Sequence, residues 1–218
     1  MKIDSVLTNP ISVGNNVFLT NNSRHFASKI SPNQAMSIGG LENSYLFNNN
    51  PVLISTRDLN NIGESHSEII NFLRDCLAFL HALWLTQDNN VNMMLGFAIS
   101  GDGKYTHSNS LSYFFTDCSG SRSDSVFIEA QLSEIADKYN DVLSGMRIDI
   151  EPEHSRQVKE FGRFNAGVNF VQQARSTPDI GLKIANYCSF FESLLSSTST
   201  ELAHQMAERA AFYLRKTP

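Results

Sequence analysis

Residues 170–214 read FVQQARSTPDIGLKIANYCSFFESLLSSTSTELAHQMAERAAFYL, which contains two helical patterns in succession. Thr177, Pro178 and Asp179 predict the start of the first helix, as an N-cap, a first-turn proline and an acidic first turn. Apolar residues then recur at helical spacing and predict a buried stripe: Ile180, Ile184, Cys188, Phe191 and Leu195. Thr198 and Glu201 form a capping box that predicts a last helix, with apolar positions Leu202, Met206, Ala210 and Tyr213.

Upstream of these residues the patterns become mixed. Helices are predicted over about 156–175, from about 128 to Gly145, and from the Ser65/Glu68 capping box to Trp84. Short strands are predicted at 5–7, 17–19, 45–47, 52–54, 93–99 and 111–115. The sequence therefore predicts an α+β fold, with a mixed strand and helix region at 1–145 and an all-α helical segment at 155–218.

The composition is that of a soluble globular chain. The 218 residues are 41% hydrophobic and 18% charged, far from the composition of disordered proteins. The apolar run from Cys76 to Leu85 is interrupted by His81 and is short of a membrane span, and no secretory signal precedes it. We therefore expect no membrane partner and a cytoplasmic location. The three cysteines lack metal-ligand spacing, so we expect reduced thiols and no structural zinc.

The charge is unevenly distributed along the chain. Residues 1–155 carry a net charge of -8, whereas residues 156–218 carry +3, and the whole chain carries -5. A modestly basic segment is compatible with a phosphate backbone, although a charge of +3 also arises by chance.

Few motifs point to a specific chemistry. Asp149, Glu151 and Glu153 form the densest acidic cluster, and we interpret it as a solvated edge, since neither a turn glycine nor further oxygen ligands follow at calcium-loop spacing. No nucleophile elbow, phosphate loop or dinucleotide fingerprint is present in the sequence. We therefore predict no metal and no cofactor.

Two charged residues interrupt the apolar patterns of the last two helices. Glu192 lies beside the predicted buried stripe, and Arg209 lies among the small residues of the last helix. The two helices are joined by a short loop and are expected to be antiparallel neighbours. We therefore predict that Glu192 and Arg209 form an ion pair, and we keep both as catalytic candidates.

Residues 170–214 closely resemble the Apea-like HEPN domain of bacterial proteins. The resemblance rests on several short motifs spread over the two helices, and the residues that carry it are Arg175, Asp179, Lys183, Tyr187, Glu192, Glu201, Leu202, Glu208, Arg209 and Ala211. It implies a helical bundle that pairs into a homodimer. The family is found in RNA-cutting effectors of defence and toxin systems.

The resemblance also implies a chemistry, which is metal-independent RNA cleavage by an R-x(4-6)-H motif. In the family this motif follows the last matched helix, so we expect a truncated chain that ends at Pro218 before the motif. A literal R-x6-H runs from Arg147 to His154, but it precedes the matched helices and contains a proline. The predicted contacts to RNA are Arg175, Lys183 and Arg209.

The predicted function is thus that of a HEPN-type, RNase-related protein of a bacterial defence or toxin system, with its own catalysis in question. The alternative is a non-catalytic module that binds a nucleotide or a regulatory protein partner. An in-frame R-x(4-6)-H motif just beyond Pro218 would favour the nuclease.

Overall fold

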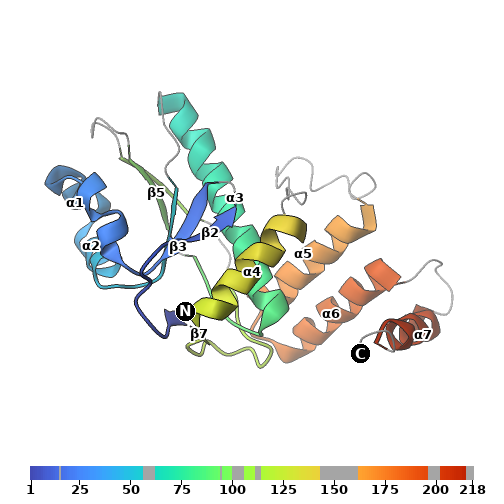
Figure 1. The fold of residues 1–218 in the computed structure, drawn as a ribbon. Coiled ribbons are helices and arrows are strands. Elements are labelled where there is room, and N and C mark those ends of the chain that lie inside the picture. Colours follow the sequence, from blue (N-terminus) through green and yellow to red (C-terminus); the bar gives the residue numbers. More distant parts are fainter. Residues whose placement is uncertain are drawn as a thin grey trace. The chain divides into compact units, whose positions relative to one another are not determined.

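A computed structural model describes residues 1–14, 16–55, 62–93, 95–99, 106–110, 114–142, 162–195 and 202–214. The chain divides into two compact units. Unit 1 contains residues 1–113 and 123–147, and unit 2 contains residues 114–122 and 148–218. Each unit is described by itself (Figure 1).

Three small sheets belong to unit 1. The strands β1 (Lys2–Ile3) and β7 (Val126–Phe127) pair in parallel. The antiparallel sheet β2-β3-β4 consists of Ile11–Gly14, Val17–Thr20 and Val52–Ser55. The third sheet is a hairpin of β5 (Gly96–Ile99) and β6 (Thr106–Asn109).

The helices of unit 1 supply most of its core. They are the 3-10 helices η1 (Ser23–His25) and η2 (Ala27–Lys29), and the α-helices α1 (Pro32–Ile38), α2 (Gly40–Phe47), α3 (Ile62–Thr86) and α4 (Glu129–Val142). Helix α4 packs against both β2 and α3. The buried residues of α3 and α4 include Leu73, Phe79, Leu83, Leu132 and Ile135.

Unit 2 is built on a helical hairpin. Helices α5 (Gly162–Ser176) and α6 (Ile180–Leu195) lie side by side, and α7 (Leu202–Leu214) packs against α6 (Figure 1). Gly167 allows a close approach of α5 to α6, because a Cβ at this position would lie 2.8 Å from Ser193 Oγ. The segment 114–122 joins the hairpin through hydrogen bonds to the end of α5.

Several predictions from the sequence are confirmed. The chain is α+β, and helices occupy the predicted positions around 65–84, 128–142 and 180–195. The strands predicted at 17–19 and 52–54 are present as β3 and β4. Leu132, Ile135 and Ala136 are buried on α4 as their spacing predicts.

Other local predictions are wrong. Residues 5–7 are not a strand. Residues 45–47 were also predicted as a strand, but they form the last turn of helix α2, which begins at Gly40. Helix α3 begins at Ile62, so Ser65 lies inside the helix and is not its N-cap. Phe114 and Phe115 are not in a strand, and residues 114–122 belong to unit 2 although they were predicted in the N-terminal region.

The start of α6 also differs from the prediction. The helix begins at Ile180, and the Asp179 carboxylate accepts a hydrogen bond from the backbone N–H of Leu182 at 2.8 Å. Asp179 is therefore the N-cap, two residues later than Thr177.

One helix in the described part of the chain is long and apolar enough to cross a membrane, over Ser67–Thr86 of α3. Half of this window is buried inside the protein, and the core helix of a globular domain can have the same length and composition. The helix is therefore weak evidence for a membrane span. The cytoplasmic location stays a prediction.

Candidate functional site

Arg175 is an interior residue of unit 2. It lies in the last turn of α5, and none of its surface is exposed. Its guanidinium carbon stands 4.1 Å from the centre of the Phe115 ring, within the range of a cation–π contact. Its backbone carbonyl accepts hydrogen bonds from the N–H and the hydroxyl of Thr116, at 2.7 and 3.0 Å. Arg175 thus holds the segment 114–122 against α5.

Lys183 is equally buried, on the face of α6 that meets α5. Its side chain is 1% exposed, and its ammonium group donates a hydrogen bond to the carbonyl of Ala174 at 2.8 Å. That carbonyl is near the C-terminal end of α5, where helix carbonyls carry partial negative charge and favour a cation. Lys183 therefore connects the start of α6 to the end of α5.

These positions correct the assignment of Arg175 and Lys183 to RNA contact. An RNA phosphate must approach a cation from solvent, and both side chains are covered. The prediction of RNA contact came with the family resemblance, and charged side chains are rarely fully buried unless they are paired. In this unit Arg175 stacks against the Phe115 ring, and Lys183 donates a hydrogen bond to a helix carbonyl.

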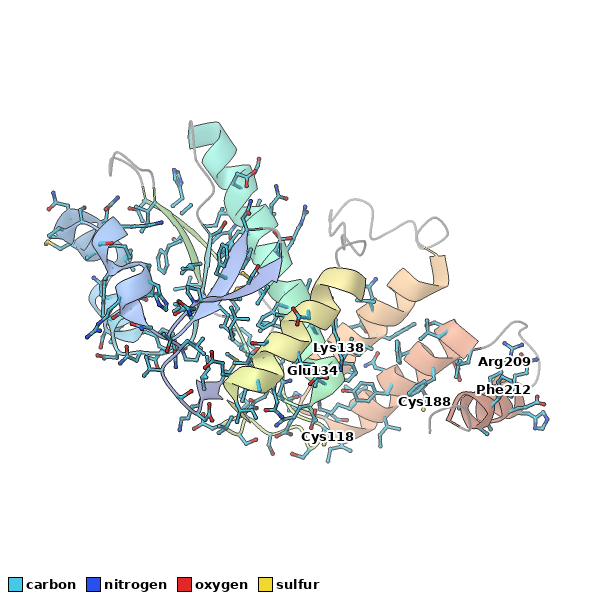
Figure 2. The ribbon with its side chains drawn as sticks, viewed as in Figure 1. Cys118, Glu134, Lys138, Cys188, Arg209 and Phe212 are labelled. Carbon is cyan, nitrogen blue, oxygen red and sulfur yellow. The ribbon has the colours of Figure 1, made fainter. Side chains whose placement is uncertain are left out.

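Arg209 remains on the surface. It is exposed on α7, near Phe212 (Figure 2), and one of its guanidinium nitrogens donates to the carbonyl of Leu195 at the end of α6. Glu192 is half-buried one turn before Leu195. The ion pair between Glu192 and Arg209 stays a prediction.

The remaining candidates from the sequence fall outside the described residues. They are Arg147, His154 and the acidic cluster Asp149, Glu151 and Glu153. Within the part of the chain that the structure describes, no three His, Cys, Asp or Glu side chains are placed to hold a metal ion.

The cysteines also correct one expectation. Cys76 is buried in α3, whereas Cys118 and Cys188 are exposed, and none of the three forms a disulfide. Cys188 was predicted in the core because it belongs to the apolar series on α6. Figure 2 shows that its side chain projects from the helix.

Unit 2 therefore brings Arg175 and Lys183 together as interior cations at the α5–α6 turn, while Glu192 and Arg209 lie at the other end of α6. Sequence reasoning missed Phe115 and Thr116, which complete the first group from a distant segment.

Comparison of the chain with family models, curated proteins and solved structures finds no significant match in any of the three. The resemblance of residues 170–214 to the Apea-like HEPN domain therefore stays a prediction.

Proposed function

We propose that the protein is an RNase-related, HEPN-type protein of a bacterial defence or toxin system, and that its C-terminal helices bind RNA through Arg209. The observation that supports this proposal is the exposure of Arg209, the only one of the three predicted RNA contacts that solvent reaches. The net charge of +3 over residues 156–218 agrees with a phosphate ligand.

Replacing Arg209 tests the RNA contact. Arg209→Ala removes one phosphate contact, so the affinity for a single-stranded RNA should fall severalfold at low salt, and the slope of log K against log salt should decrease by about 0.7. Fluorescence anisotropy at several salt concentrations measures both quantities. Lys138→Ala removes an exposed cation of unit 1 and should change neither. Equal binding by Arg209→Ala and the unmodified protein would overturn the proposal.

Cleavage of RNA at an enzyme-like rate is not expected from this chain. Within the described residues, Arg209 is not joined by a histidine at R-x(4-6)-H spacing, because His204 precedes it. An R-x6-H spacing from Arg74 to His81 lies on α3, but His81 is buried there, where an RNA cannot reach it. Incubation of the purified protein with total RNA checks this expectation. Specific cleavage that is lost in His154→Ala would show that the motif from Arg147 to His154 is active.

A second candidate function, a non-catalytic module for a protein or nucleotide, is supported by a different feature. The exposed side of α6 is uncharged and apolar, which suits a protein surface better than a phosphate backbone. If the protein does not bind RNA even at low salt, this second function is favoured.

A further inference from the structure

Phe212 is the most exposed aromatic side chain in the part of the chain that the structure describes. It lies on α7 and is 63% exposed, compared with 51% for Tyr45 and 50% for Phe114. An exposed ring offers a flat apolar face, against which a second flat group can stack. The last helix of unit 2 therefore presents a stacking surface to solvent.

Phe212 adjoins the arginine that is proposed to contact RNA. Arg209 and Phe212 are three residues apart on α7, and side chains at this spacing are neighbours on a helix surface. Figure 2 shows the two side chains near each other on this helix. The guanidinium of Arg209 also donates to the carbonyl of Leu195, which holds it toward the end of α6. An exposed cation and an exposed ring are thus neighbours on one surface.

The charges around the ring are arranged unevenly. At about 100° per residue, Arg209 lies about 60° to one side of Phe212, and Glu208 lies about 40° to the other side. A phosphate at Arg209 is therefore separated from the exposed carboxylate of Glu208 by the ring. Ala207 and Ala211 are also exposed, and their side chains are too short to cover the ring.

We propose that Phe212 stacks on an unpaired base of the RNA whose phosphate contacts Arg209, so that the ligand is a single strand or a loop. The inference rests on the proposed function, because Arg209 supplies the phosphate contact. Proteins that bind single strands combine cations along the backbone with aromatic side chains on which bases stack. In a duplex each base is covered by its neighbours, so the ring has no base face to contact.

Substitutions of Phe212 test the stack, with binding of a labelled oligouridine measured by fluorescence anisotropy. Phe212→Ala should weaken binding about tenfold, because one contact between a base and a ring is lost. Phe212→Tyr keeps the ring and should retain most of the affinity. The slope of log K against log salt should not change in Phe212→Ala, since no phosphate contact is removed. Equal affinity of Phe212→Ala and the unmodified protein would overturn the proposal.

An abasic RNA separates stacking from other effects of the substitution. This probe has the phosphates of the oligouridine but lacks the bases. The unmodified protein should bind it about tenfold more weakly than oligouridine, whereas Phe212→Ala should bind the two probes with nearly equal affinity. If Phe212→Ala loses the same affinity for both probes, the ring acts through the folding of α7 and the proposal is wrong.

The matched control is Phe191→Ala. Phe191 is an exposed aromatic residue of the same unit, at 46%, but the residues three and four positions away from it on α6 are uncharged. This variant should bind oligouridine as the unmodified protein does. A loss equal to that of Phe212→Ala would show a general effect of exposed apolar surface and would contradict the proposal.

The stack and the proposed function fail in different ways. If Arg209→Ala weakens binding and lowers the salt slope while Phe212→Ala changes neither, the RNA contact stands and the stack is absent. If Arg209→Ala binds oligouridine as the unmodified protein does, the proposed function fails and the stack loses its phosphate contact.

Discussion

Arg175→Ala is expected to lower the free energy of unfolding of unit 2 by about 3 kcal/mol. The side chain is fully buried, and the substitution removes both its packing and its cation–π contact with Phe115. Such a contact contributes about 1–2 kcal/mol when it is shielded from water. Urea denaturation measures the change in the free energy of unfolding. Hydrogen exchange of the amides of α5 and α6 shows whether the loss lies within this unit.

Two further variants separate the interior role of Arg175 from its charge. Arg175→Lys keeps the charge but loses the planar group that stacks on Phe115, so it should recover only part of the stability. Arg209→Ala removes an exposed arginine of the same unit and should change stability by less than about 0.5 kcal/mol. If Arg175→Ala costs no more than Arg209→Ala, Arg175 is not an interior residue.

Gly120→Ala is expected to destabilise unit 2 by about 3 kcal/mol, for a reason of backbone geometry. Gly120 has a φ of +79°, and a Cβ at this position would lie 2.3 Å from the carbonyl oxygen of Pro178. Because the obstructing atom belongs to the backbone, the loop itself must move. Movement of the loop strains the neighbouring hydrogen bonds that Thr116 donates to the carbonyls of Arg175 and Thr177.

Gly40→Ala is the control for this substitution. Gly40 lies in the first turn of α2 with an ordinary φ, and no atom lies within 4 Å of the position of its Cβ. Alanine should therefore be neutral there or stabilising by up to about 1 kcal/mol. Thermal denaturation of both variants measures the difference, and equal midpoints would show that the close approach of Gly120 to Pro178 is absent.

The helices could be predicted from the sequence because their signals are local. The apolar spacing along α3 and α4 depends on residues within a few turns. These signals also placed the core residues Leu132 and Ile135 correctly.

The buried side of α6 could not be predicted in this way. The helix has two apolar series, and the fully apolar one through Ile184 and Cys188 was predicted in the core, whereas the structure buries the side that contains Lys183. A lysine is acceptable there because its long stem packs and its ammonium reaches the carbonyl of Ala174, nine residues earlier. Because Ala174 lies on α5, the apolar spacing along α6 gives no signal for this hydrogen bond.

The site residues show the same dependence on distant contacts. Arg175 was predicted to contact RNA from the resemblance of residues 170–214 to an RNA-cutting family, but its aromatic partner Phe115 is sixty positions earlier. A contact across that separation leaves no periodic signal near Arg175. Arg209 was predicted to pair with Glu192, and the structure exposes it on α7.

Arg175 and Lys183 are interior cations of unit 2, and Arg209 is the exposed one of the three predicted RNA contacts. Brief amine labelling of the native protein, followed by peptide mass spectrometry, tests this claim most directly. Lys183 should remain unmodified in the folded protein, whereas Lys138, whose side chain is 65% exposed, should be modified rapidly. Modification of Lys183 at the rate of Lys138 would contradict the claim.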